Sequence, residues 1–150
     1  MRRSLLLTSL LALFACSGVL PSAERGMAGQ WQSDDVSLVR GSLSEVYTFA
    51  LDMTVEDNGD IRGVMDVIYF HTERSDEVRT IRQTITSPGP TGQSRIYLTG
   101  TNPIQTAGPE LVGVYAPDDL DCALPDGDLL ACIWGSDANG NPVAVTLQRR

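Results

Sequence analysis

The fold is decided by residues 46–70, VYTFALDMTVEDNGDIRGVMDVIYF, in which two strand-like segments flank a turn. In the first segment, large apolar residues occupy five successive odd positions and alternate with smaller or polar ones. These residues are Tyr47, Phe49, Leu51, Met53 and Val55. A period of two is that of a β-strand, whose successive side chains point to opposite faces. We therefore predict a strand over residues 46–55 with one face buried and the other mostly in water.

Two Asn-Gly pairs mark turns. Asn58-Gly59 separates the two segments quoted above, and Asn139-Gly140 separates LLACIW from VAVTLQ. An Asn-Gly pair between strand-like runs favours a β-hairpin, because a type I′ turn needs positive φ at both central residues. The sequence therefore predicts two antiparallel hairpins with type I′ turns.

Three weaker strand-like runs lie between these hairpins: residues 78–86, 94–100 and 110–116. In the last of them, Val112 and Val114 share one side of the predicted strand. The connections between the runs are rich in glycine and proline, which favour turns. No amphipathic helical run of useful length follows the N-terminal hydrophobic leader.

These runs amount to about seven or eight strands in some 120 residues, which predicts an all-β domain over residues 28–150. The economical architectures are a small antiparallel barrel and a sandwich. A barrel leaves no exposed strand edges. The sequence does not decide between the barrel and the sandwich.

The leader has the pattern of an export signal. Arg2 and Arg3 precede an apolar stretch of 11 residues, 5–15, which Thr8 and Ser9 interrupt. This is the length of the hydrophobic region of a signal peptide, and it is too short for a comfortable membrane span. The leader also fits ordinary secretion with cleavage near Ala23 and an uncleaved membrane anchor, and both stay open.

Leu13-Phe14-Ala15-Cys16 resembles the lipobox of bacterial lipoproteins. The resemblance implies cleavage before Cys16, diacylglycerol on its sulfur and acylation of its new amine. Residues 1–15 would then be a signal peptide and residues 16–27 a lipidated cysteine with a tether. The implied location is the cell envelope, membrane-anchored and facing the periplasm or in the outer membrane, to which Ser17 favours sorting in many Gram-negative bacteria.

The cysteine count fits this reading. The chain has three cysteines, and lipidation of Cys16 leaves Cys122 and Cys132 as an even pair in an oxidising compartment. We predict that these two form a disulfide, which would stabilise the fold by roughly 2.5–3 kcal/mol in the chain-entropy model. The alternative is two buried free thiols.

The domain also resembles the lipocalin and avidin superfamily of small barrels. The resemblance rests on Gly29-Gln30-Trp31 in the first predicted strand and on Arg149 or Arg150 in the last. It implies a tryptophan that closes one end of the barrel and stacks under a basic residue of the final strand. The avidin set of ligand-facing tryptophans is absent from the sequence, so biotin binding does not carry over.

Charge excludes one class of partner. Residues 17–150 hold nine arginines, no lysine and 19 acidic residues, a net charge of −10. This average field repels a phosphate backbone, so we predict no nucleic-acid partner. Five arginines with acidic neighbours in the strand regions predict cross-strand ion pairs. They are Arg62, Arg74, Arg79, Arg82 and Arg95.

No residue pattern indicates catalysis. His71, the only histidine, is predicted to be a solvated hairpin residue, and no nucleophile-elbow motif accompanies it. Residues 117–128 hold five aspartates, which offer oxygen ligands for Ca²⁺ as an alternative to a merely hydrated loop. They are Asp118, Asp119, Asp121, Asp126 and Asp128. We predict no cofactor and no enzymatic activity.

Together these features predict a non-catalytic cell-envelope lipoprotein. Its β-domain would act as a binding or structural accessory module, with the membrane as partner through the lipid anchor. A protein partner in a membrane complex, of which this chain is an auxiliary subunit, is one form of this prediction. The alternative is a lipocalin-like carrier of a small apolar ligand. It predicts a cavity of several hundred Å³ lined by Tyr47, Phe49, Leu51, Met53 and Val55.

Overall fold

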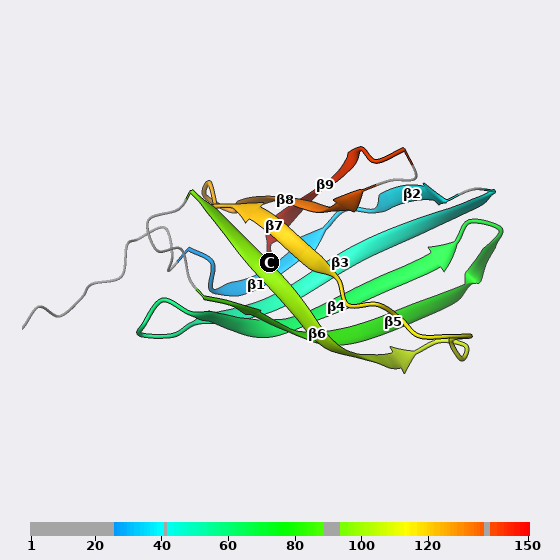
Figure 1. The fold of residues 1–150 in the computed structure, drawn as a ribbon, viewed down its shortest axis with the longest axis horizontal. Helices are drawn as coiled ribbons and strands as arrows, with labels where there is room; N and C mark the ends of the chain where they lie inside the picture. Colours follow the sequence, from blue (N-terminus) through cyan, green and yellow to red (C-terminus); the bar gives the residue numbers. More distant parts are fainter. Residues whose placement is uncertain (1–25, 41, 89–93, 137–138) are drawn as a thin grey trace, which may run out of the picture.

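The computed structural model describes residues 26–40, 42–88, 94–136 and 139–150. Over these ranges the chain forms nine β-strands (Figure 1). They are β1 (Gly29–Ser33), β2 (Val36–Arg40), β3 (Leu43–Val55), β4 (Ile61–His71), β5 (Arg74–Ser87), β6 (Arg95–Ala107), β7 (Asp119–Ala123), β8 (Leu129–Ser136) and β9 (Pro142–Arg149). The same ranges hold no helix that is long and apolar enough to cross a bilayer. The predictions for the leader and for Cys16 lie outside the described residues.

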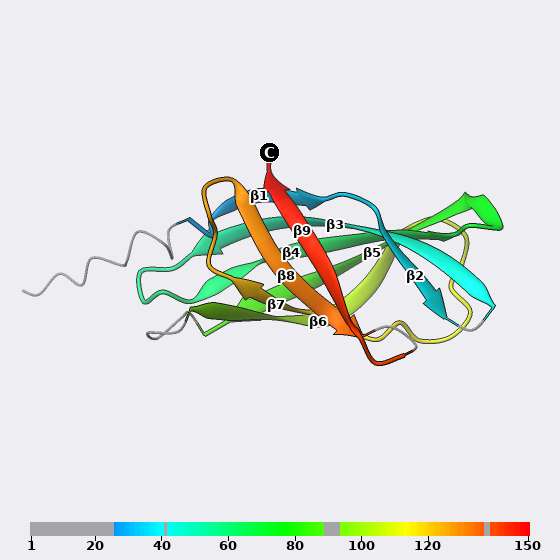
Figure 2. The ribbon, with the colours of Figure 1, turned by 90° about the horizontal axis from the view of Figure 1, so that it is seen from above.

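The strands form a closed antiparallel barrel. The hydrogen-bonded order is β1-β9-β8-β7-β6-β5-β4-β3, and β3 pairs again with β1 to close eight strands. β2 is an additional strand that pairs with the first half of β3, beyond β1 (Figure 2). The all-β prediction is confirmed, and the barrel is the architecture that the chain adopts.

Residues 46–70 form the pair of strands that their pattern predicts. β3 and β4 pair from Val55 opposite Ile61 to Glu45 opposite His71. The odd positions of β3 point into the barrel, where Phe49 is completely buried. One continuous core fills the interior with side chains from all nine strands. The alternation of apolar and polar residues therefore sets which face of each strand lines the barrel.

The first hairpin turn differs from the type I′ prediction. Gly59 has a φ of 90°, whereas Asn58 has no positive φ. The Gly59 N–H donates to the Glu56 carbonyl at 2.9 Å, and the Glu56 N–H donates to the Asp60 carbonyl at 2.8 Å. The Asn58 side-chain oxygen accepts the Asp60 N–H at 3.0 Å. The hairpin is confirmed, but its turn is a three-residue loop that needs left-handed backbone at Gly59 only.

The prediction of a strand over residues 110–116 is wrong. These residues belong to an irregular connection between β6 and β7, here called the β6–β7 segment (residues 108–118). Gly108 and Gly113 have φ values of 92° and 108°, which an extended strand does not allow. The predicted separation of the side chains onto two sides is nonetheless correct. Tyr115 packs against the core, whereas Val112 and Val114 are fully exposed.

Trp31 closes one end of the barrel. Its ring is buried and lies under the Arg149 guanidinium, whose central carbon is 4.2 Å from the ring centroid. The indole N–H donates to the Met27 carbonyl at 2.9 Å. Arg149 donates in turn to the carbonyls of Ala28, at 2.6 Å, and Gly26. This is the tryptophan plug under a final-strand arginine that the barrel resemblance implies.

Cys122 and Cys132 lie opposite each other on β7 and β8, with their sulfur atoms 2.03 Å apart. The predicted disulfide is therefore present. On the outer surface, Arg82 forms two hydrogen bonds with Asp66, its register partner across β4 and β5, at 2.8 and 2.7 Å. This pair is a cross-strand ion pair of the kind predicted for the strand arginines.

Candidate functional site

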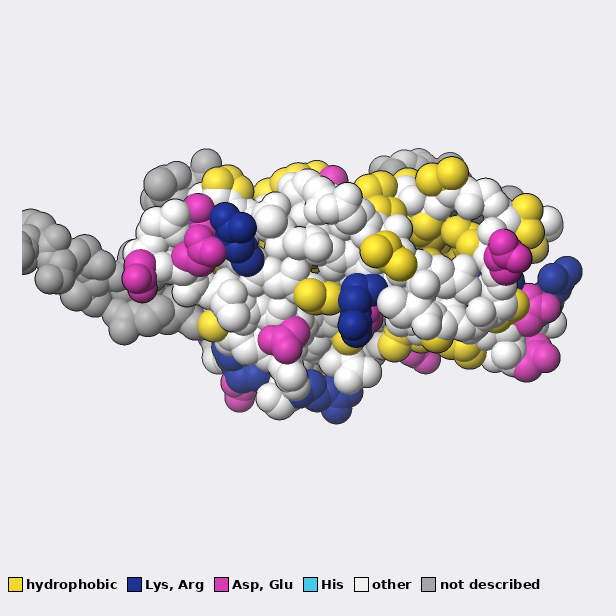
Figure 3. All heavy atoms as spheres, turned by 90° about the horizontal axis from the view of Figure 1, so that it is seen from below, with side chains coloured by type: hydrophobic (Ala, Val, Ile, Leu, Met, Phe, Trp, Pro, Cys, Tyr) yellow, Lys and Arg dark blue, Asp and Glu magenta, His cyan; other side chains and the backbone are white. Residues whose placement is uncertain are grey.

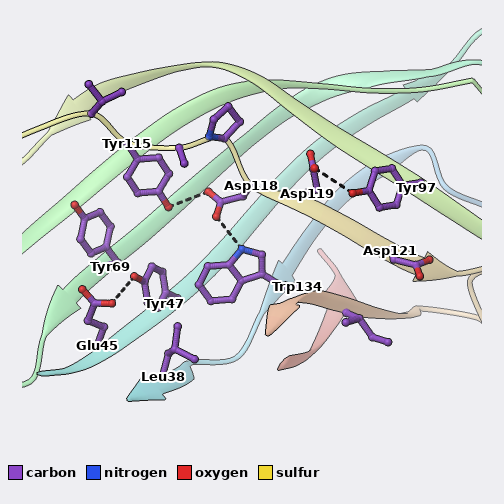
Figure 4. A pocket seen from close by; sticks show the side chains of 15 residues that line it. Leu38, Glu45, Tyr47, Tyr69, Tyr97, Tyr115, Asp118, Asp119, Asp121 and Trp134 are labelled. Carbon is purple, nitrogen blue, oxygen red and sulfur yellow. Dashed lines mark hydrogen bonds between the residues drawn. The ribbon is translucent and has the colours of Figure 1, made fainter. Parts of the chain in front are cut away.

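A cleft of about 730 Å³ lies at the end of the barrel away from Trp31. Figure 4 shows the side chains that line it. Trp134, in its wall, and Arg149, above Trp31, lie toward opposite ends of the paired strands β8 and β9. Side chains from β2, β3, β4, β6, β7 and β8 line it, together with the end of the β6–β7 segment. Its lining includes five aromatic side chains, Tyr47, Tyr69, Tyr97, Tyr115 and Trp134. Closure of the barrel brings these distant parts of the sequence together.

Four of the aromatic rings form one arc. Tyr47 stacks on Tyr69, with ring centroids 5.4 Å apart and an angle of 17° between the planes. Trp134 lies tilted against Tyr47 at 4.6 Å, and Tyr115 lies tilted against Tyr69 at 5.8 Å. Phe49 supports Trp134 from the core through an edge contact at 5.0 Å. These contacts fix the ring orientations in the wall of the cleft.

Asp118 anchors the arc from the β6–β7 segment. Its buried carboxylate accepts hydrogen bonds from the Tyr115 hydroxyl at 2.8 Å and from the Trp134 indole N–H at 2.8 Å. Gln83, buried on β5, donates to the same carboxylate at 2.9 Å and accepts the Asp118 backbone N–H at 3.0 Å. These bonds hold the end of an irregular segment against the barrel.

Gly100 on β6 makes room for this clamp. A Cβ atom at position 100 would lie 2.2 Å from the Asp118 carbonyl oxygen and 2.5 Å from the Gln83 side-chain oxygen. Both distances are far below van der Waals contact, so any side chain at Gly100 would displace the backbone of Asp118. The glycine thus permits the close approach on which the cleft wall depends.

Three further carboxylates line the cleft. Glu45 accepts the Tyr47 hydroxyl at 2.7 Å, and its other oxygen lies 3.5 Å from the His71 Nδ1. Asp119 accepts the Tyr97 hydroxyl at 3.1 Å and the Gly100 N–H at 3.0 Å. Asp121 is paired with Arg95 at 2.8 Å.

The face predicted to meet an apolar ligand is divided between cleft and core. Tyr47 lines the cleft. Phe49, Leu51 and Met53 are buried in the packed core, and Val55 is partly buried against it. Of the residues on this predicted face, only Tyr47 at its end therefore lines the cleft.

The five aspartates of residues 117–128 do not converge. Asp118 points to Tyr115 and Trp134, and Asp121 pairs with Arg95. Asp128 pairs with Arg149, toward the Trp31 end of the barrel, at 3.2 Å. Within the part of the chain that the structure describes, no three His, Cys, Asp or Glu side chains are grouped so that they could hold a metal ion.

His71 lies beside a hairpin turn, as predicted, but it is only partly exposed to solvent. It ends β4 opposite Glu45, and its side chain is 27% exposed. Its Nδ1 atom is buried and makes no hydrogen bond. The register of β3 and β4 causes this burial, because it sets the imidazole beside the Glu45 carboxylate.

Sequence reasoning missed Glu45, Tyr69, Tyr115 and Trp134 as site residues. Two of them carried a usable signal. Tyr69 falls in the odd-numbered inward positions of β4, and Trp134 continues the inward alternation of Leu130 and Cys132 on β8. Tyr115 had no such signal, because its segment is irregular.

Exposed hydrophobic side chains occur on the β6–β7 segment and on β6. Val112 and Val114 protrude from the β6–β7 segment, and Ile104 on β6 is 64% exposed. On the face seen in Figure 3, hydrophobic side chains gather around a hollow in the right-hand half of the molecule.

Burial raises the pKa of the Tyr115 hydroxyl far above its ordinary value of 10, and the nearby Asp118 carboxylate raises it further. The folded protein therefore keeps this proton when the unfolded chain releases it. Stability from Tyr115 is complete below about pH 10 and falls above it, by about 1.4 kcal/mol per pH unit for one proton.

Urea denaturation at several pH values from about 9 to 11 measures this loss, since the slope follows from the linkage of proton binding to folding. A Tyr115→Phe variant should lose stability less steeply over this range than the wild type. Equal slopes for the two proteins would contradict the assigned burial of the hydroxyl.

Comparison with known proteins finds no matching family model, no similar curated protein and no similar solved structure.

Proposed function

We propose that this protein is a cell-envelope lipoprotein whose barrel binds a small ligand in the cleft and acts as a non-catalytic binding module. The observation that carries the proposal is the cleft itself. Its volume of about 730 Å³ lies within the range of small-molecule sites, and its wall combines fixed aromatic rings with a few polar groups. The rest of the barrel interior is a packed core.

The state of the polar groups favours binding over acid–base catalysis. Tyr115 holds its proton tightly, because burial and Asp118 raise its pKa. A general acid or base works best with a pKa near the working pH. The Tyr47 and Tyr115 hydroxyls are each fixed by a carboxylate, which suits groups that orient a ligand.

The cleft gives less support to the apolar-carrier alternative. An apolar ligand would displace water from the carboxylates that share the cleft with the aromatic rings, Glu45, Asp118, Asp119 and Asp121. Loss of water without a compensating partner costs several kcal/mol for a charged group, on the order of the binding energy of a small ligand. A ligand with its own polar or charged group avoids this cost.

The lipid anchor is the second part of the proposal and rests on the lipobox. A diacylated Cys16 with a third acyl chain on its amine would hold the barrel at the membrane. The residues between Cys16 and the barrel would then serve as the tether.

The ligand site can be tested by filling it. Ala116 lines the cleft, so an Ala116→Trp substitution places an indole in the ligand's space. Val112→Trp adds the same side chain to the same segment at a fully exposed position that does not line the cleft. We expect compounds that bind the full-length protein in a ligand-observed NMR screen to lose binding to the first variant and keep it with the second.

The screen should contain amines, acids, sugars, aromatic compounds and fatty acids. A compound that binds both variants as well as the wild type binds elsewhere. If no compound in the complete screen binds the wild type and loses its binding to the Ala116→Trp variant, the proposed ligand site is overturned.

A further inference from the structure

We infer that the free edge of β2 is a docking site for an extended peptide segment of a partner protein, which adds to the sheet as a further strand. This inference goes beyond the proposed ligand site, because it uses main-chain groups of β2 and does not depend on what the cleft binds. It follows from three properties of β2: its unpaired edge, the direction of its backbone groups, and an edge that lacks the usual interruptions.

The sheet divides where β1 passes into β2. β1 lies between β3 and β9, with Ser33 opposite Leu147 on β9. β2 continues along β3 from Val36, which lies opposite Tyr47, but no described residue of β9 pairs with it. Figure 2 shows β9 diverging from β2 beyond this point. β2 therefore ends the hydrogen-bonded order of the strands and has one free edge.

Two residues of β2 turn their backbone N–H and C=O groups to this edge. The Ser44 carbonyl accepts the Thr72 N–H at 2.9 Å, on the β4 side of β3. Residues along an antiparallel strand turn their backbone groups to one neighbouring strand and the other in alternation. Val39, the register partner of Ser44, therefore turns its groups away from β3, and Ser37 does the same. The edge thus offers two donors and two acceptors to a new strand.

The other free edges near the cleft are interrupted. Natural proteins blunt such edges with proline, bulges or charged residues, because an open edge pairs with other chains. Over the described ranges, β6, β8 and β9 each lose one partner strand toward this end of the barrel. β6 carries Pro103 there, after Asn102 with a φ of 52°. β8 has an irregular register around Gly135, and β9 begins at Pro142.

β2 has none of these interruptions. Its register with β3 is unbroken from Val36 to Arg40, and it contains no proline. Its only charged residue, Arg40, is its last. The side chain of Val39 is 59% exposed, so an added strand with a β-branched or aromatic residue beside it would cover apolar surface. The edge of β2 is therefore open to strand addition.

An extended peptide suits this edge better than a second copy of the chain. β9 and its partner β8 run from the shared pairing at Ser33 and Leu147, so they border the free edge of β2. A strand of a second barrel would bring its own neighbouring strands against β8 and β9, whereas a peptide segment brings none. Two copies of a chain with a net charge of −8 also repel each other.

Amide hydrogen exchange of the full-length protein in detergent tests the edge itself. The Leu38 N–H faces β3, because it alternates with those of Ser37 and Val39. We expect the Leu38 amide to exchange at least about tenfold more slowly than the other two. Slow exchange of Ser37 and Val39 in the protein without any peptide would show that the edge is already paired, within the barrel or with a second copy, and would overturn the inference.

A random dodecapeptide library displayed on phage supplies the probes for the partner segment. Val39→Pro removes one N–H at the free edge, where proline is tolerated, and the matched control Val39→Ala keeps it. We expect selected peptides to bind the wild type and the alanine variant alike, and to bind the proline variant at least about tenfold more weakly. A selection that yields no such peptide would overturn the inference.

Backbone methylation of a selected peptide gives a test that does not depend on the folding of a variant. A strand added to one edge bonds through the N–H groups of every second residue. Methyl groups on that set of nitrogen atoms should weaken binding at least about tenfold, whereas methyl groups on the other set should leave it largely unchanged. Equal losses from the two sets would contradict strand addition.

Discussion

A Trp31→Ala variant is expected to lose about 3–5 kcal/mol of folding free energy, the range measured for removal of a buried tryptophan or phenylalanine. The ring is 1% exposed and closes one end of the barrel. Its removal leaves a cavity and strips the Arg149 guanidinium of its aromatic contact. Proteins of this size are stable by only about 5–15 kcal/mol, so the variant should be close to unfolding.

Urea denaturation followed by circular dichroism measures the loss. Trp31→Phe is the matched control, because it keeps one ring under Arg149 and removes the other ring of the indole with its N–H bond to Met27. It should cost clearly less than Trp31→Ala, on the order of 1–3 kcal/mol. A loss below about 1 kcal/mol for Trp31→Ala would mean that the tryptophan does not hold this end of the barrel together.

A Cys16→Ser variant is expected to move from the membrane fraction to the soluble fraction of the cell envelope or to remain as an uncleaved precursor. The lipobox implies that the Cys16 sulfur carries the diacylglycerol, and serine cannot take its place. Ser17→Asp is the control, since it keeps the lipidated cysteine and should stay bound to a membrane. Fractionation followed by intact-mass measurement distinguishes these products.

Either of two results would contradict the lipid anchor. A wild-type protein that keeps its leader and carries no lipid would indicate a retained membrane segment. A wild-type protein that begins near residue 24 without lipid would indicate ordinary secretion with cleavage near Ala23. Neither result would alter the account of the barrel.

The periodic parts of the fold could be predicted from the sequence because burial imposes the same period on every strand. The odd positions of β3 are an example. The Cys122–Cys132 disulfide was predictable for another reason, since setting Cys16 aside leaves one pair of cysteines. The first turn could not be settled, because Asn58-Gly59 fits two loop geometries and the local bonds of Asp60 select between them. The β6–β7 segment looked like a strand because its apolar residues alternate, but Gly108 and Gly113 bend it away from the sheet.

The cleft was beyond sequence reasoning for a different reason. Its wall depends on barrel closure, which brings Tyr47 on β3, Tyr115 on the β6–β7 segment and Trp134 on β8 into contact range. It also depends on the close approach of Asp118 to Gly100, which no local pattern signals. The same closure buries most of the face that the sequence suggested for an apolar ligand.

The most direct test of the ligand site uses the chain's two tryptophans as internal reporters. The indole N–H of Trp134 lies in the cleft wall, and that of Trp31 is bonded to Met27 at the closed end of the barrel. In nitrogen-15 NMR spectra of tryptophan-labelled full-length protein, a saturating concentration of a screened compound that binds the wild type but not Ala116→Trp should shift the Trp134 indole signal and leave that of Trp31 in place. A shift of the Trp31 signal alone, or of neither signal at saturation with that compound, would contradict the account.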